Sequence, residues 1–226
     1  MNEQPNGSPE PEPITEEIDV IVASDAHIGY VDEILETINR AAKVRGTGIA
    51  KRSPEYVSQK MRERKAVIAL TKSGEFAGFS YIESWSRKEF VANSGLIVAD
   101  RFRGKGVASR IKRRIFELSR EMFPQAKIFS LTTGAAVMKM NSELGYRPVT
   151  FDQLTDDEAF WRGCESCVNY DILQRNGGHK CLCTGLLYDP AEHQEPPASE
   201  SEEDKSNEQL IQELEKLLAT WKNAKK

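Results

Sequence analysis

The sequence lacks a run of apolar residues long enough to cross a bilayer, which takes about 20 residues. Its N-terminus, MNEQPNGSPEPEP, is acidic and rich in proline, so it lacks the character of a signal or transit peptide. With a net charge of −4, the chain also lacks the overall basic excess that is typical of nucleic-acid-binding proteins. These absences predict a cytoplasmic protein with no membrane partner and no nucleic-acid partner.

Cysteine is scarce and is confined to one segment, at Cys164, Cys167, Cys181 and Cys183. In a reducing compartment such a cluster is more typical of a metal site, a catalytic thiol or buried thiols than of disulfides. The intervening NGG is typical of a hairpin turn, and alternation along CLCTGLLY places the last two cysteines on one strand face. We therefore predict a cysteine-rich hairpin over residues 162–190. It could hold zinc through four thiolates, with His179 as an alternative ligand, or it could simply bury the thiols.

Composition divides the chain into four parts. Residues 1–17 have the composition of a disordered tail, and residues 191–206 repeat it as an acidic linker. Residues 18–190 form the predicted domain. In residues 207–226, leucine, isoleucine and tryptophan recur at helical spacing and form one apolar stripe. This amphipathic helix is predicted to dock on the domain or on a second copy of the chain.

Periodicity within the domain predicts a mixed α/β fold with a meander of strands in the middle. Ser53 is a plausible N-cap before Pro54, and KSGE is a plausible hairpin connection. The expected strands are residues 19–23, 66–70, 76–84, 93–99, 127–131 and 147–151, and the expected helices are residues 27–43, 54–64, 107–123 and 135–144.

The segment SGLIVADRFRGKGVASRIKRRIFELS places a glycine-bearing turn between a strand and a long helix. Gly104 and Gly106 let the backbone approach an anion closely, and the amides of the first helical turn can hold phosphate oxygens. Arg101, Arg103 and Lys105 add positive charge at the same point. The alternative is a tight turn before a solvated basic helix, but the combination favours an anion site.

The sequence Arg-x-x-Gly-x-Gly at Arg101–Gly106 resembles the Q/R-x-x-G-x-G/A motif of the GNAT acyltransferase superfamily. The order of predicted elements resembles that fold over residues 18–190, which implies a central twisted mixed sheet flanked by helices. The resemblance implies that backbone amides from Arg101 through Val107 and Ala108 cradle the pyrophosphate of an acyl-coenzyme A. It also implies that the main chain of Leu96, Ile97 and Val98 pairs with the pantetheine arm. An amine would then attack the thioester while backbone donors stabilise the oxyanion.

A second resemblance concerns the acceptor. LTTGAAVMKMNSELGYRPV, at residues 131–149, and GIAKRSPE, at residues 48–55, resemble segments in the acyltransferase domain of N-acetylglutamate synthases. This implies that Lys51, Arg52 and Ser53 contact the carboxylates of a glutamate substrate, with Thr132 and Thr133 beside the acyl group. A guanidinium suits carboxylate recognition. The alternative for residues 51–53 is an exposed loop that leads into a helix cap.

The core also resembles short acyltransferases of the arginine-biosynthesis clusters of Bacteroidetes, a lineage associated with succinylated intermediates. This implies either acetyl-CoA or succinyl-CoA as the donor. Many GNAT enzymes carry a tyrosine acid where this sequence has Asn141, which can hydrogen-bond sulfur but donates a proton poorly. Glu83 is the preferred base, although a solvent-facing strand carboxylate is the plainer reading, and Tyr81 and Tyr146 are second candidates.

We therefore expect an N-acyltransferase that acts on the α-amine of L-glutamate in arginine biosynthesis. One alternative keeps the chemistry but changes the acceptor to another small amine or a protein N-terminus. A third reading is a non-catalytic module that binds acyl-CoA and docks a partner through its C-terminal helix.

Overall fold

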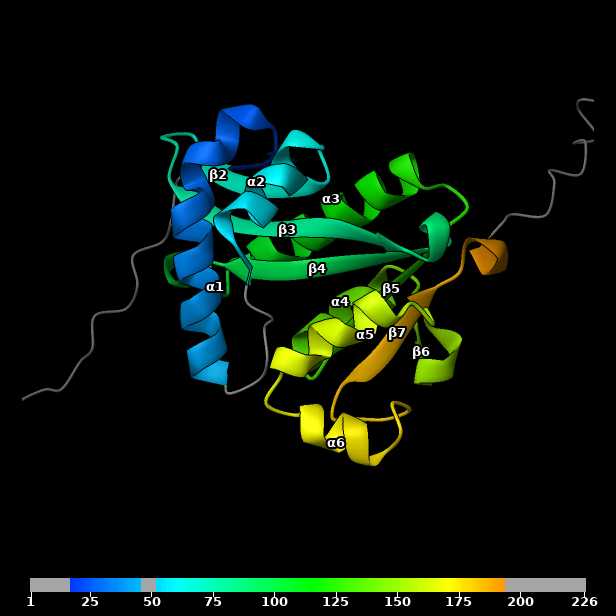
Figure 1. Ribbon diagram of the computed structural model, residues 1–226. Helices are drawn as coiled ribbons and strands as arrows, with labels where there is room; N and C mark the ends of the chain where they lie inside the picture. The colour runs from blue at the N-terminus through cyan, green and yellow to red at the C-terminus, as the bar shows by residue number, and fades with distance from the viewer. Residues whose placement is uncertain (1–16, 46–51, 194–226) are drawn as a thin grey trace, which may run out of the picture. The chain divides into compact units, whose positions relative to one another are not determined.

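The computed structural model describes residues 17–45 and 52–193, and the chain divides into two units after Asp189 (Figure 1). The described part of the second unit is a single 3-10 helix, Pro190–His193. The predicted C-terminal helix lies outside the described residues, as do the predicted linker beyond His193 and the predicted tail before Glu17. None of the described helices is long and apolar enough to cross a membrane.

The secondary structure follows the predicted alternation closely, with further helices in the last third of the domain. The strands are β1 (Ile18–Val22), β2 (Ala66–Thr71), β3 (Phe76–Trp85), β4 (Phe90–Val98), β5 (Lys127–Thr132), β6 (Arg147–Val149) and β7 (Thr184–Tyr188). The α-helices are α1 (Val31–Arg45), α2 (Pro54–Arg62), α3 (Val107–Met122), α4 (Ala135–Glu143), α5 (Glu158–Arg162) and α6 (Tyr170–Arg175).

The strands form one mixed sheet of seven strands in the order β1-β2-β3-β4-β5-β7-β6. Every pairing is antiparallel except that between β4 and β5, which run parallel and are joined through α3. Parallel neighbours need such a crossover, whereas β2 and β3 are joined by the predicted short turn. The mixed α/β fold with a central sheet is therefore confirmed.

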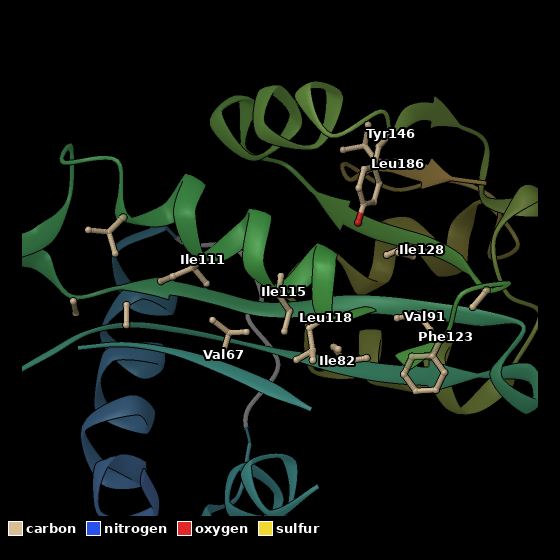
Figure 2. Close-up of a cluster of buried hydrophobic side chains, with 14 of the residues drawn as sticks. Val67, Ile82, Val91, Ile111, Ile115, Leu118, Phe123, Ile128, Tyr146 and Leu186 are labelled. Carbon is tan, nitrogen blue, oxygen red and sulfur yellow. The ribbon is translucent and has the colours of Figure 1, made fainter. Parts of the chain in front are cut away.

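Helix α3 covers one face of the sheet, and its apolar stripe provides the main core. Figure 2 shows Ile111 and Ile115 between the helix and the sheet, where Val67, Ile82 and Val91 pack against them. All five side chains are fully buried. Burying each contributes about 1.5–3 kcal/mol, so this interface fixes where the N-terminus of α3 lies.

The opposite face carries two separate clusters. Helices α1 and α2 pack on the first, which includes Tyr81, whereas residues of α5 pack on the second, which includes Trp85. Side chains alternate along a strand, so Tyr81, Glu83 and Trp85 share this face of β3. Glu83 thus lies on the strand between the two clusters.

The predicted cysteine-rich hairpin over residues 162–190 is wrong. The segment forms a 3-10 helix at Gly163–Ser166 and then α6, and β7 begins only at Thr184. Gly177 and Gly178 have the left-handed backbone expected of NGG, but their amides donate to carbonyls of α6, Gly178 to Leu173 at 3.0 Å. The same glycines that suit a hairpin turn also end a helix, and here they do the latter. Cys181 and Cys183 therefore precede the strand instead of sharing one of its faces.

Two element boundaries also differ from the predictions. The helix predicted from residue 27 begins as a 3-10 helix, Asp25–Tyr30, and becomes α-helical at Val31. Strand β4 begins at Phe90, before the predicted start at residue 93, because the turn after β3 is short.

Candidate functional site

The turn before α3 has the backbone geometry that its glycines suggest. Gly104 and Gly106 both have positive φ values, of 75° and 76°, and Gly106 is the N-cap of the helix. The side chain of Phe102 is buried and anchors the turn to the core. The amides of the first helical turn have no acceptor within the helix, and they carry the positive end of its dipole. This turn can therefore bind an anionic group through main-chain donors.

The basic side chains of the turn are partly engaged with carboxylates. Arg101 lies 2.6 Å from Glu75, and Arg103 lies 2.8 Å from Asp100. These pairs are solvent-exposed, so each is worth only a fraction of 1 kcal/mol to about 1 kcal/mol and can yield to an incoming anion. Lys105 is exposed on the turn itself.

The sheet opens beside this turn. Strand β4 pairs with β5 only at Phe90, Val91 and Ala92, whereas its pairing with β3 continues to Val98. In the described part of the chain, no strand therefore pairs with the β5-facing edge of β4 over Leu96–Val98. An extended ligand could hydrogen-bond to these main-chain groups.

A bulge at Gly95 accompanies this opening. The register of β4 against β3 shifts between the pairs Phe79–Ile97 and Tyr81–Ser94. Gly95 has a φ of 66°, and a Cβ there would lie 2.2 Å from Tyr81 Cε1. The close approach requires glycine, and bulges often re-aim side chains next to active sites.

The comparisons with known proteins identify the fold. No protein-family model matches the sequence, and no curated protein matches it. Among solved structures, N-acetylglutamate synthase from Neisseria gonorrhoeae, complexed with coenzyme A and N-acetyl-glutamate, aligns with a TM-score of 0.53 and 16% identity over 76% of this chain. An acetyltransferase of the GNAT family from Listeria monocytogenes aligns with a TM-score of 0.51 and 12% identity, covering 76% of this chain and 94% of that one. A GNAT acetyltransferase from Staphylococcus aureus aligns with a TM-score of 0.51 and 14% identity, and the alignment covers 62% of this chain and 91% of that one.

The chain has the GNAT fold. It spans only 35% of the length of the Neisseria enzyme, and at these identities the likeness concerns the fold alone. The predicted fold is thus confirmed.

Within the GNAT fold, a polar cluster surrounds the predicted base. Glu83 is 8% exposed, and it accepts hydrogen bonds from the hydroxyls of Tyr56 and of Ser94, the latter at 3.0 Å. Arg52 lies 3.8 Å from the same carboxylate and donates to the hydroxyl of Tyr81 at 2.7 Å. We call these five residues the Glu83 cluster. The solvent-facing alternative for Glu83 is wrong, and two of the sequence-predicted site residues, Glu83 and Arg52, lie together.

The protonation of the Glu83 cluster is set by burial and by mutual charge. Burial, with the nearby Glu83, raises the pKa of Tyr81 to about 12 and that of Tyr56 further still. Burial opposes the charged form of Arg52, but Tyr81 and Glu83 outweigh it and raise the pKa of the guanidinium. Both phenols therefore stay protonated, with the Tyr56 hydroxyl donating to Glu83 and the Tyr81 hydroxyl accepting from Arg52.

The start of α2 fits the plainer reading of Ser53. Its hydroxyl accepts a hydrogen bond from the Tyr56 amide at 3.2 Å, so Ser53 is the helix N-cap. This cap aims α2 so that Tyr56 reaches Glu83, and it makes Ser53 a positioning residue for the cluster. Lys51 lies outside the described residues.

The predicted site residues at the end of β5 and on α4 have different surroundings. Thr132 accepts a hydrogen bond from the Gly134 amide at 3.0 Å and so shapes the turn into α4, whereas Thr133 is exposed. Asn141 is fully buried, and both polar atoms of its side chain lack a partner within the described part of the chain. Leaving such groups unpaired costs about 1–3 kcal/mol, so a polar ligand at α4 would relieve a real penalty.

A second buried polar group lies where β4 leaves β5. The Nζ of Lys112 lies 3.3 Å from Asn93 Oδ1 and 4.9 Å from the centre of the Tyr146 ring. The Tyr146 hydroxyl donates to the same Asn93 oxygen at 3.1 Å, and Asn93 donates to Ser119 at 2.8 Å. Burial lowers the pKa of Lys112 from 10.5 to about 7. Tyr146 therefore belongs to a structural network, away from the Glu83 cluster.

The cysteines lie close enough to influence one another, and Cys164, Cys181 and Cys183 pack against the hydrophobic cluster of α5. Across the described ranges, however, no group of three or more histidines, cysteines or acidic residues could hold a metal ion as arranged. The zinc prediction thus gains no support from the structure. Burial raises the pKa of Cys164 to about 11 and that of Cys183 to about 12, which favours protonated thiols.

A cavity of about 690 Å³ lies elsewhere, between α5, α6 and the segment around Phe151. Its walls include Trp161, Tyr170 and Leu173, and none of its lining residues belongs to the α3 turn or to the Glu83 cluster. The glycine turn before α3 and the buried carboxylate of Glu83 carry the stronger chemical signal, so the candidate site is assigned to them.

Sequence reasoning missed Tyr56, Ser94 and Lys112. Tyr56 follows Ser53 by three residues, and that spacing places it on the first turn of α2. Ser94 is brought to Glu83 by strand register, which the sequence does not reveal. Lys112 was absorbed into the basic pattern of α3, although it lies one residue after the buried Ile111.

Proposed function

We propose that the protein transfers an acyl group from an acyl-coenzyme A to a primary amine. The observation that carries this proposal is the glycine turn at the N-terminus of α3, directly beyond an edge of β4 that pairs with no other described strand. The turn offers amides to a pyrophosphate, and the edge offers main-chain groups to an extended amide-bearing arm. The bound coenzyme A in the Neisseria structure of the same fold supports this assignment.

The cofactor-binding residues in this proposal are those expected from the sequence. The main chain from Arg101 to Ala108 binds the diphosphate, and Arg103 and Lys105 add charge. Leu96, Ile97 and Val98 present their main chain to the arm. Binding would break weak surface ion pairs of the turn and leave the core unchanged.

Glu83 is proposed to receive the proton of the acceptor ammonium, directly or through a water molecule. The hydroxyls of Tyr56 and Ser94 and the guanidinium of Arg52 hold its carboxylate in place. Asn141 is proposed to hydrogen-bond the thioester sulfur, because its buried amide has no partner in the described residues. A thiolate can leave without a strong proton donor, so an amide suffices there.

The acceptor is proposed to be L-glutamate. Arg52 is suited to bind a carboxylate, and Thr132 and Thr133 lie at the end of β5, from which α4 begins. The N-acetyl-glutamate bound to the Neisseria structure supports the same acceptor class. The proposed donor is acetyl-CoA or succinyl-CoA and the proposed setting is arginine biosynthesis, both from the sequence resemblance. The proposed cytoplasmic location follows from the composition of the sequence.

The test is to incubate the purified protein with acetyl-CoA or succinyl-CoA and a panel of amino acids and to follow free thiol. Thiol release that depends on glutamate is the expected result. Thiol release only with other amines, or only with a peptide N-terminus, would show that the acceptor is one of those and not glutamate. Binding of coenzyme A without release for any acceptor would instead support the non-catalytic module.

A further inference from the structure

Lys60 is a second cation beside the Glu83 cluster, and the sequence pattern did not single it out. It lies four residues after Tyr56 on α2, so the two side chains occupy the same face of the helix. Its Nζ lies 5.0 Å from the centre of the Tyr56 ring and 6.0 Å from that of Tyr81. The guanidinium carbon of Arg52 lies 5.3 Å and 5.8 Å from the same two ring centres, so both cations lie beside the same aromatic pair.

Within the described part of the chain, Lys60 donates no hydrogen bond and forms no ion pair. The carboxylate closest along its own helix, Glu63, is already bound by Lys65 at 2.6 Å and by Gln59 at 2.7 Å. Glu83 is engaged by Arg52, Tyr56 and Ser94. The half-buried ammonium thus rests on aromatic rings without an anion of its own.

Burial of the Lys60 ammonium is offset only in part by the charges around it. Burial lowers the pKa of Lys60, and the positive charges of Lys65 and Arg52 act in the same direction against the attraction of Glu83 and Glu63. An incoming carboxylate close to the ammonium would favour the charged lysine.

We propose that Lys60 is a specificity-determining residue that binds a carboxylate of the acceptor beside Arg52, which restricts the acceptor to amino acids. The inference rests on the proposed acyl transfer and adds the residue that selects the substrate class. A lysine can move from the aromatic rings to a ligand because its stem is flexible and its ammonium donates in several directions. An amine without a carboxylate would leave Lys60 unpaired and gain nothing from it.

The experiment compares the wild-type protein with Lys60→Met and Lys60→Arg. Arg62→Met serves as the matched control, because Arg62 lies on the same helix but is 57% exposed and pairs with Asp25. Thiol release gives KM and kcat for glutamate and for its two monoamides, and calorimetry in the presence of coenzyme A gives the affinity for glutamate. Thermal unfolding checks each variant, and Lys60→Gln replaces Lys60→Met if the latter does not fold.

For Lys60→Met, we expect at least a tenfold rise in KM and Kd for glutamate, with kcat changed less than threefold. Lys60→Arg should recover most of the affinity, and Arg62→Met should match the wild type. One of the two monoamides should have a higher KM than glutamate in the wild type, and this difference should disappear in Lys60→Met. The carboxylate that this monoamide lacks is then the one that Lys60 binds.

An unchanged KM and Kd in Lys60→Met, or a fall in kcat alone, would overturn the inference. The proposed function can fail separately. If the wild type binds glutamate in a Lys60-dependent manner but releases no thiol, then the acyl transfer is wrong and the carboxylate site stands. If the wild type neither binds nor acylates any amino acid, both are wrong.

Discussion

Lys112 makes the stability of this protein depend on pH in a calculable way. It is 2% exposed, and burial lowers its pKa from 10.5 to about 7. The unfolded chain therefore holds a proton that the folded chain has released between about pH 7 and pH 10.5, so stability rises with pH across that window. Below pH 7, where the lysine is charged in both states, its burial lowers the free energy of unfolding by about 5 kcal/mol.

The perturbation is Lys112→Met, which keeps the volume and removes the titration. Asn93 keeps a donor in this variant, because the Tyr146 hydroxyl also reaches its Oδ1, at 3.1 Å. Between pH 7 and pH 9 the wild type should gain about 2 kcal/mol of unfolding free energy from this lysine, and the variant should gain none of it. The unfolding free energy of the variant minus that of the wild type should therefore fall by that amount from pH 7 to pH 9.

Urea unfolding at pH 6, 7, 8 and 9, under reducing conditions, measures this difference. Lys139→Met is the matched control, because Lys139 is 79% exposed on α4 and should shift stability equally at every pH. Curves for the wild type and Lys112→Met that stay parallel within about 0.5 kcal/mol from pH 7 to pH 9 would refute the reasoning. The lysine would then be charged in the folded protein and paired more strongly than its contacts with Asn93 and Tyr146 indicate.

Four further predictions concern the site and its supports. Gly106→Ala should weaken coenzyme A binding several-fold, measured by calorimetry. The space beside Gly106 is open, so the effect would come from a left-handed backbone that costs alanine about 1–2 kcal/mol. Arg52→Ala should raise KM for the acceptor at least tenfold and leave coenzyme A affinity intact; equal losses of both would make Arg52 structural. Gly78→Ala should lower unfolding free energy by about 1–3 kcal/mol, because a Cβ there would lie 2.6 Å from a side-chain carbon of α3. At pH 8, Cys164 and Cys183 should react with iodoacetamide more slowly than an unfolded control, since burial raises the pKa of both thiols; equal rates would contradict their burial.

The parts of the site that the sequence predicted are those that local pattern determines. The turn before α3 could be anticipated because strand, glycines and helix follow one another without interruption, and each has a local physical reason. Ser53 was read correctly as a cap for the same reason. The NGG segment failed because glycine in a left-handed conformation suits both a hairpin turn and a helix end. Which of the two forms depends on whether the preceding residues pack as a helix, as Leu173 does.

Residues brought together across the sheet could not be read from pattern alone. Glu83 and Arg52 are 31 positions apart, and their 3.8 Å approach depends on how α2 lies on β3. Resemblance to a family supplied Arg52, and Glu83 was chosen as a carboxylate on a predicted strand, but neither argument pointed to Tyr56 or Lys60. These two each lie one residue before a fully buried residue of α2, Val57 or Met61, at the edge of its buried face, so the helical pattern alone does not mark them as site residues.

Several departures from ordinary folding rules lie on β4, on α4 and in the turn before α3, and others lie elsewhere, as at Ser86–Lys88. Gly104 and Gly106 hold a left-handed backbone before α3, Gly95 forms a bulge in β4, and the buried amide of Asn141 in α4 has no partner among the described residues. Each lowers stability, and each is unnecessary for closing the core, which α3 achieves through its apolar stripe. Natural proteins tolerate such local conflicts mainly where function requires them. Because these elements flank the point at which β4 and β5 part, the cost of these features fits the ligand site proposed there.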